Sequence, residues 1–229
     1  MNEKSPQVVL LHGLSRSPLS MAKLANQLEA KGMKVLNLGY NSLVDDYQQI
    51  LSALEAKLQD WVNNDQTLHF VGHSFGGMLI RGLVDKRPEW NSGRCVMLGS
   101  PNKGTQVASF MLSHWWFKHF VPKVTKDLTP ESELLATLPE PQIETGMIAG
   151  NVSSSFVIPV SWYYKKATQN ALGDGVVELS NTQCSTMTDF IIMPLHHSFM
   201  TWDSELVEEV VHFLQNGKFT PKQLRPATE

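Results

Sequence analysis

A serine between two glycines is the feature of this sequence best suited to chemistry. Ser74 stands in the pattern Gly-His-Ser-Phe-Gly over residues 72–76, after an apolar run at 68–71 and before a helical pattern. A sharp turn from strand to helix exposes the serine hydroxyl, and small neighbours let the backbone pack closely around the turn. The first amides of the helix favour negative charge that develops beside the serine. We therefore predict that Ser74 is a nucleophile.

A second segment is suited to stabilising a negatively charged oxygen. Leu14 follows His12 and Gly13 at the end of the first apolar run, residues 8–11. A backbone N–H at this position can point at a reacting carbonyl group. We predict that the N–H groups of Leu14 and Phe75 form an oxyanion hole, and that His12 shapes the loop rather than acting as a base.

A serine hydroxyl becomes a strong nucleophile only when a histidine accepts its proton and a carboxylate orients that histidine. Two adjacent histidines, His196 and His197, follow the last predicted strand and precede the last predicted helix. Adjacent side chains point in different directions, so only one of them can be the base. No Cys, Asp or Glu stands at ligand spacing beside the pair, so the pattern does not indicate a metal site, and we predict no cofactor.

Asp174 is the best candidate for the carboxylate. It lies between two glycines, in a turn that can aim a short side chain inward before Val176 and Val177 restart regular structure. A plain turn aspartate is the alternative interpretation. Asp127 and Glu131 compete for the role, because they lie downstream of the apolar run at 96–99.

The elements that must position these residues alternate along the chain, which predicts an α/β fold. Short apolar runs of the kind that form buried strands are found at 8–11, 35–38, 68–71, 96–99, 146–149 and 190–193. Helical patterns lie between them, at 21–28, 50–62, 78–85 and 204–214. We expect one domain over residues 1–229, a mostly parallel central sheet with helices on both faces, and a polar tail at 220–229.

Two segments interrupt the alternation. Residues 105–141 form a long excursion after a predicted strand, and residues 151–172 form another. Long excursions in a compact domain often cover a binding site, so we predict that 105–141 is a lid, with extra core or a dimer contact as alternatives. The apolar side chains predicted to bind an acyl group are Phe110, Met111, Trp115 and Trp116.

Composition excludes several classes of function. The net charge of −3 gives no basic field to attract nucleic acid. Two cysteines are too few for a disulfide scaffold. The sequence shows neither an apolar signal segment nor an apolar run long enough to cross a bilayer. We therefore expect a protein of a reducing compartment, the cytoplasm by default, while the oligomeric state is left open.

The sequence resembles the α/β-hydrolase superfamily, and within it the lipase-like branch. Four segments carry the resemblance: Leu11-His12-Gly13-Leu14, Gly72-His73-Ser74-Phe75-Gly76-Gly77, Gly99-Ser100-Pro101-Asn102-Lys103-Gly104-Thr105 and Asp174-Gly175-Val176-Val177. The third is similar to a stretch of bacterial triacylglycerol lipases, with Asn102 where they usually carry His. The run His197-Ser198-Phe199-Met200 resembles hydrolases related to the GPI inositol-deacylases.

This resemblance implies the order serine, acid, histidine along the chain, with Ser74 as nucleophile, Asp174 as acid and His197 rather than His196 as base. It implies hydrolysis of a small-molecule or lipid-like carboxylic ester through an acyl-enzyme. Two alternatives stay open: an acyltransferase or thioesterase with the same three residues, and a non-catalytic binding protein on a hydrolase scaffold.

Overall fold

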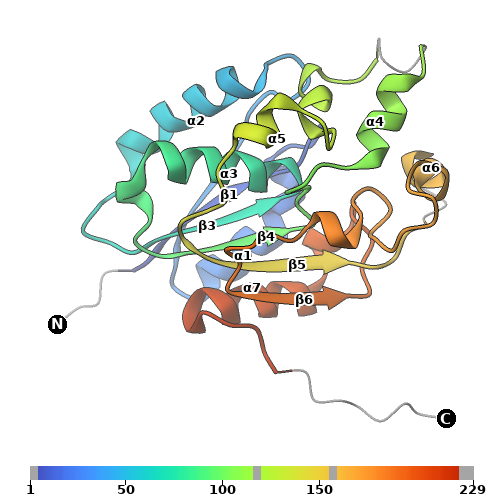
Figure 1. Ribbon diagram of the computed structural model, residues 1–229. Coiled ribbons are helices and arrows are strands. Elements are labelled where there is room, and N and C mark those ends of the chain that lie inside the picture. The colour runs from blue at the N-terminus through green and yellow to red at the C-terminus, as the bar shows by residue number, and fades with distance from the viewer. Residues whose placement is uncertain (1–4, 116–119, 155–158, 222–229) are drawn as a thin grey trace, which may run out of the picture.

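A sheet of six strands forms the centre of the molecule in the computed structural model, which describes residues 5–115, 120–154 and 159–221 (Figure 1). The strand order is β2-β1-β3-β4-β5-β6, and every neighbouring pair is parallel. The strands are β1 (Gln7–Leu11), β2 (Lys34–Leu38), β3 (Leu68–His73), β4 (Arg94–Leu98), β5 (Glu144–Gly150) and β6 (Asp189–Met193). All six predicted strands are present, and the predicted α/β class is confirmed.

Helices cover both faces of the sheet, as predicted (Figure 1). On one face α1 (Ala22–Ala30) and α7 (Ser204–Asn216) pack on side chains such as Leu10 and Val96. On the other face α2 (Tyr47–Trp61) and α3 (Phe75–Lys86) pack on the alternate side chains of the same strands. β1 and β3 are buried on both faces, and residues 8–11 of β1 form a continuous apolar run, whereas β3 also buries His69 and His73.

The helix ends follow from local sequence. Asp46 and Gln49 form a capping box at the start of α2, in which each side chain accepts a hydrogen bond from the other residue's backbone N–H. Asp203 caps α7, and Gly217 ends it with a φ of 75°, in the left-handed conformation that favours glycine. Short 3-10 helices make further connections: η1 (Pro18–Met21), η2 (Pro88–Trp90), η3 (Lys123–Leu128), η4 (Leu179–Asn181) and η5 (Met200–Trp202).

The two excursions lie at the carboxyl end of the sheet (Figure 1). Residues 105–141 contain α4 (Gln106–Ser113), η3 and α5 (Glu133–Thr137), and the second excursion contains α6 (Pro159–Ala167). Phe110 of α4 and Tyr163 of α6 stack with their ring centroids 5.5 Å apart. Residues 116–119, with the predicted acyl-binding Trp116, lie outside the described residues, as does most of the tail at 220–229.

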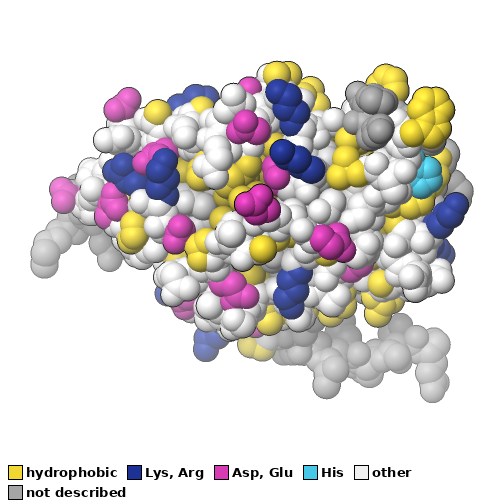
Figure 2. Space-filling view, turned by 45° about the horizontal axis from the view of Figure 1, so that its top comes forward, with side chains coloured by type: hydrophobic (Ala, Val, Ile, Leu, Met, Phe, Trp, Pro, Cys, Tyr) yellow, Lys and Arg dark blue, Asp and Glu magenta, His cyan; other side chains and the backbone are white. Residues whose placement is uncertain are grey.

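The surface near α4 is more apolar than its surroundings. Figure 2 shows hydrophobic side chains gathered at this end of the molecule, while charges of both signs are spread over the rest of the face. Trp115 and Phe120 are 76% and 85% exposed there. Among the residues that the structure describes, no helix is long and apolar enough to cross a membrane.

Candidate active site

Ser74 lies at the sharp turn that leads from β3 into α3. Its φ of 54° and ψ of −121° are unusual for a residue other than glycine, and such strain stores on the order of 1–3 kcal/mol. The Ser74 N–H donates to the carbonyl of Leu98 on the neighbouring strand, which holds the turn in place. The turn therefore presents the side chain at the carboxyl end of the sheet, as the sequence pattern predicts.

The flanking glycines are required by close packing. A Cβ at Gly72 would lie 2.6 Å from the backbone nitrogen of Gly77. A Cβ on Gly76 would collide with the carbonyl oxygen of Leu11, at the end of β1. Because glycine has no Cβ, the start of α3 can approach the sheet closely. Its first N–H groups then point toward the serine.

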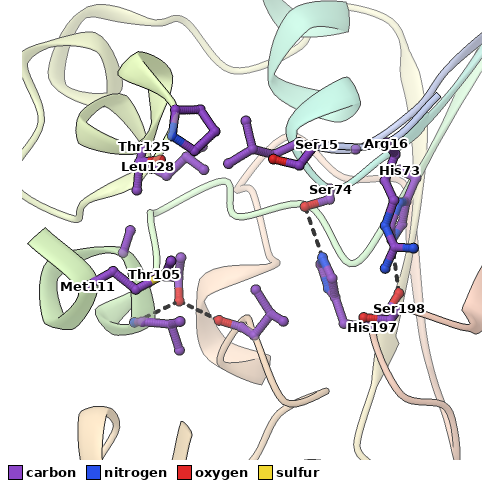
Figure 3. Close-up of a pocket in the computed structure, with 16 residues that line it drawn as sticks. Ser15, Arg16, His73, Ser74, Thr105, Met111, Thr125, Leu128, His197 and Ser198 are labelled. Atoms are coloured by element: carbon purple, nitrogen blue, oxygen red, sulfur yellow. Dashed lines mark hydrogen bonds between the residues drawn. The ribbon is translucent and has the colours of Figure 1, made fainter. Parts of the chain in front are cut away.

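Three side chains from distant parts of the chain form a continuous line of hydrogen bonds. The Nε2 atom of His197 lies 2.9 Å from the Oγ atom of Ser74 (Figure 3). The Nδ1 atom of the same ring lies 2.7 Å from Oδ2 of Asp174. All three residues are buried, at 7%, 6% and 1% exposure for Ser74, His197 and Asp174. The structure thus brings together the three residues predicted from the sequence.

The turn that follows Asp174 orients its carboxylate. Oδ1 accepts hydrogen bonds from the N–H groups of Val176 and Val177, at 3.1 and 2.8 Å, which leaves Oδ2 free to face His197. The N–H of His197 donates to the carbonyl of Asp174, so the two residues are joined through backbone and side chain. The expected restart of regular structure at Val176 is wrong: the segment is a turn with one bridge between Gly173 and Glu178, because its N–H groups serve the carboxylate.

The alternative residues lie elsewhere. The Nδ1 atom of His196 accepts a hydrogen bond from the N–H of Ser198, and its ring packs against Phe199. Asp127 lies on η3, where burial raises its carboxyl pKa and the charge of Asp46 adds to the rise. The hydrogen bonds therefore single out His197 and Asp174.

Two residues of the site, His73 and Gly99, lie in segments that carry the family resemblance, but the sequence assigned no role to either of them. His73 is buried, and its Nε2 atom lies 3.0 Å from the carbonyl oxygen of His197. Burial lowers the pKa of His73 well below its ordinary value, so the ring is neutral and donates this hydrogen bond. Gly99 has a φ of 55°, and a Cβ there would lie 2.8 Å from Oδ2 of Asp174. The positive φ and the close approach together require glycine.

The loop after β1 lies over the serine as predicted. His12 stacks on Tyr40 with ring centroids 4.1 Å apart, and its Nδ1 atom lies 2.9 Å from the carbonyl oxygen of Gly13, so it shapes the loop. Leu14 lines the cavity beside Ser74. Phe75 is the first residue of α3, where an N–H has no acceptor within the helix.

A cavity of about 220 Å³ opens beside Ser74 (Figure 3). Its residues come from the β1 loop, the serine turn, the first excursion and the histidine loop: Gly13, Leu14, Ser15, Arg16, His73, Ser74, Thr105, Val107, Ala108, Met111, Pro122, Thr125, Leu128, Val176, His197 and Ser198.

Only part of the predicted acyl-binding set lines this cavity. Met111 does, together with Val107 and Ala108, since positions three and four apart share one face of a helix. Phe110 precedes Met111 on α4, and its side chain packs against Tyr163 of α6. Trp115 is exposed at the surface. For Phe110 and Trp115 the structure differs from the prediction.

Four histidines buried without charge make the stability of the fold depend on pH. Burial lowers the pKa of His12, His73 and His196, and that of His69 to about 4. Above about pH 6.5 the folded and unfolded chains both hold these rings neutral. Below it only the unfolded chain takes up the protons, so stability falls as the pH falls toward the folded-state pKa values.

We expect the free energy of unfolding, measured in urea, to fall as the pH is lowered from 7.5 to 5. His69 alone should account for about 2 kcal/mol of this decrease. His69→Gln should flatten this dependence by about that amount. An equal slope in the wild type and the His69 variant would contradict the assignment.

Comparison with known proteins shows which family this chain belongs to. Residues 7–172 match the sequence model of the family described as palmitoyl protein thioesterase. A Drosophila melanogaster protein named lysosomal thioesterase PPT2 homolog is 30% identical over 132 residues, which are 53% of this chain and 43% of that protein. The matched part thus spans less than half the length of this curated relative.

Solved structures share the fold at low sequence identity. The mature lipase BlEst2 of Bacillus licheniformis has a TM-score of 0.69 and 19% identity, covering 86% of each chain. The metagenomic carboxyl esterase MGS0156 has a TM-score of 0.66 and 14% identity, covering 86% of this chain and 65% of its own. The resemblance to the α/β-hydrolases is confirmed. Since the family match over residues 7–172 covers well over half of the 229 residues, the chain belongs to the palmitoyl protein thioesterase family, a family of serine hydrolases.

Proposed function

We propose that this chain is a serine hydrolase that cleaves carboxylic esters through an acyl-enzyme on Ser74. The observation that carries the proposal is the line of hydrogen bonds from Ser74 through His197 to Asp174 beside a largely apolar cavity. This arrangement supplies a nucleophile, a base and an orienting carboxylate within reach of a bound acyl group.

In the first half of the reaction Ser74 is acylated. Nε2 of His197 takes the proton as Oγ of Ser74 attacks the carbonyl carbon, and the N–H groups of Leu14 and Phe75 hold the oxyanion that forms. When the tetrahedral intermediate collapses, the bond from the carbonyl carbon to the leaving group breaks. The departing alkoxide takes the proton from His197 and leaves as the alcohol.

In the second half water releases the acyl group. Nε2 of His197 takes a proton from water as its oxygen attacks the acyl carbon, and collapse returns the proton to Oγ of Ser74. The carboxylic acid leaves, and the enzyme is restored. Asp174 accepts the Nδ1–H of His197 throughout and stabilises the imidazolium ion that forms twice in the cycle.

Residues 105–141 are proposed as the lid of this site. Thr105, Met111 and Leu128 from this segment line the cavity opposite Ser74 and His197 (Figure 3). A cover of this kind excludes water from the acyl chain while leaving the carbonyl group at the serine.

A thioester substrate is the second candidate, favoured by the family match and by the name of the Drosophila relative. The same steps apply, with a thiolate as leaving group. Parallel assays with an octanoyl thioester and the matching oxygen ester, with and without an added alcohol, separate the possibilities. We expect release of octanoic acid from both esters. Octanoyl transfer to the alcohol in place of release to water would indicate an acyltransferase, and failure with both esters would contradict the proposal.

The cytoplasmic location remains a prediction from the sequence, while the Drosophila relative is named a lysosomal thioesterase.

A further inference from the structure

The turn that holds Asp174 is bonded on its other side to the first excursion. The N–H of Val177 donates to Oδ1 of Asp174 at 2.8 Å. The carbonyl of Val176 belongs to the same peptide unit, and it accepts a hydrogen bond from the hydroxyl of Thr105, the residue before α4. A peptide unit is planar, and its C=O and N–H point in opposite directions. The bond from Thr105 therefore fixes the plane that directs the Val177 N–H at the carboxylate.

The same bond also strengthens the donor. A hydrogen bond accepted by the C=O polarises the peptide unit, so its N–H becomes a better donor. Oδ1 of Asp174 receives this N–H, while Oδ2 faces Nδ1 of His197 at 2.7 Å. The line of hydrogen bonds that ends at Ser74 thus begins at Thr105, on the excursion proposed as the lid.

The direction of the Thr105 hydrogen bond follows from its partners. Oγ1 of Thr105 accepts the N–H of Val107 at 3.2 Å, which caps the start of α4. A carbonyl oxygen can only accept, so the single hydroxyl proton of Thr105 is directed at Val176. Thr105 is 3% exposed, so little water can compete for this proton. The contact therefore depends on the hydroxyl group of residue 105.

Thr105 is itself held by the core of the protein. Its N–H donates to the carbonyl of Leu128 on η3. The guanidinium of Arg81, buried on α3, donates to the carbonyl of Asn102 just before the excursion and to that of Leu138 near its end. The base of the excursion is thus anchored on α3. Thr105 is therefore a fixed point to which the turn is fastened.

A second contact fastens the far end of the turn. Oε1 of Glu178 accepts the N–H of Gln106, the first residue of α4, at 3.0 Å. This N–H has no acceptor within its own helix, and negative charge is favoured at a helix start. Glu178 is buried and forms a bridge with Gly173 across the turn. The turn is thus joined to two adjacent residues at the start of α4.

Resting on the proposed function, we propose that Thr105 is a positioning residue for catalysis, which acts on Asp174 through the peptide unit between Val176 and Val177. Without the hydroxyl this peptide unit can rotate, and its N–H no longer holds Oδ1 of the carboxylate in one direction. His197 is then less well aligned with Ser74. A loss of alignment lowers kcat and leaves KM nearly unchanged, whereas a loss of cavity wall raises KM.

Thr105→Val removes the hydroxyl and keeps the branched side chain. We expect kcat for p-nitrophenyl octanoate to fall about tenfold to a hundredfold, with KM within about twofold of the wild type. Thr105→Ser restores a donor at the same position and should return kcat to within about threefold of the wild type. Thr105→Ala removes the hydroxyl without placing a methyl group against the Val176 carbonyl, so it carries the same prediction if the valine variant does not fold.

Thr182→Val is the matched control. Thr182 is also 3% exposed, and its hydroxyl donates to a backbone carbonyl, that of Leu179, at 2.7 Å. This carbonyl lies outside the turn at 174–178, so the control loses a buried hydrogen bond of the same kind without disturbing Asp174. We expect its kcat to stay within about twofold of the wild type. Equal kcat in the two valine variants, or a loss in Thr105→Val that serine does not restore, would overturn the proposal.

Proton NMR of the free protein separates this proposal from the proposed function, because it needs no substrate. The proton between His197 and Asp174 lies in a short bond to a carboxylate, and such a proton resonates far downfield of other N–H protons. We expect its signal to weaken in Thr105→Val and to persist in Thr105→Ser and Thr182→Val. If no ester is hydrolysed while this pattern is seen, the catalytic proposal fails and the placement of Asp174 by Thr105 stands. If esters are hydrolysed and Thr105→Val keeps both kcat and the signal, the positioning role fails alone.

Discussion

Replacing Ser74 by alanine is expected to lower kcat for p-nitrophenyl octanoate by a factor on the order of 10⁴ to 10⁶. The hydroxyl is the only group of this residue that reaches His197, at 2.9 Å, and alanine offers no nucleophile in its place. KM should change little, because the apolar wall that is proposed to bind the acyl chain is left intact. Steady-state kinetics at matched protein concentration measure both quantities.

The Ser74→Ala protein should also keep its fold. Alanine has the same Cβ as serine, so the strain of the positive φ at the turn is unchanged, and the backbone bond to Leu98 remains. Circular dichroism and the thermal unfolding midpoint provide the control. A well-folded variant that keeps a tenth or more of the wild-type kcat would contradict the role of Ser74, since the expected loss is larger by a factor of about 10³ or more.

The second large effect distinguishes the two adjacent histidines. His197→Asn should lower kcat by a factor on the order of 10⁴, because it removes the ring that joins Ser74 to Asp174. His196→Asn is the matched control. The ring of His196 accepts a hydrogen bond from the N–H of Ser198, and an asparagine side chain offers an acceptor in its place. We expect a change of less than about tenfold for this control.

The same kinetic assay on both variants decides the assignment. A large loss in the His196 variant with an active His197 variant would show that the base is the other histidine. Equal losses in two folded proteins would show that the loop as a whole, rather than one ring, is required.

The strands and the serine turn could be predicted because their signals are local. A strand buried on both faces is mostly apolar, as residues 8–11 are throughout and residues 68–71 are except for His69. The glycines of the serine turn stand within four residues of each other, and each is required by a contact that a Cβ would prevent. The approach of Asp174 to His197 was also predictable, from the glycines around the acid and the resemblance to known hydrolases.

The supporting residues could not be predicted, because their partners are remote in sequence. His73 donates to the backbone of a residue 124 positions away, and nothing near His73 marks that contact. Arg81 is an arginine in an amphipathic helix, where a solvated charge is the ordinary expectation. Its partners are the carbonyl oxygens of Asn102, Leu138 and Pro139, together with the side-chain oxygen of Asn102, all 21 to 58 positions away.

The residues that line the cavity were predicted only in part, because amino-acid type does not set the direction of a helix face. Phe110 and Met111 are adjacent and both apolar. About 100° of rotation separates adjacent positions on a helix, so one faces α6 and the other faces the cavity. The register of α4 against its neighbours decides between them, and that register depends on both excursions together.

Covalent labelling with a fluorophosphonate tests the central claim most directly. The reagent transfers its phosphonyl group to an activated serine, with loss of fluoride. We predict one adduct per chain, located on Ser74 by peptide mass spectrometry, and much slower labelling in the His197→Asn protein. A folded wild-type chain that gains no adduct, or gains it on another residue, would contradict the assignment of Ser74 as the nucleophile.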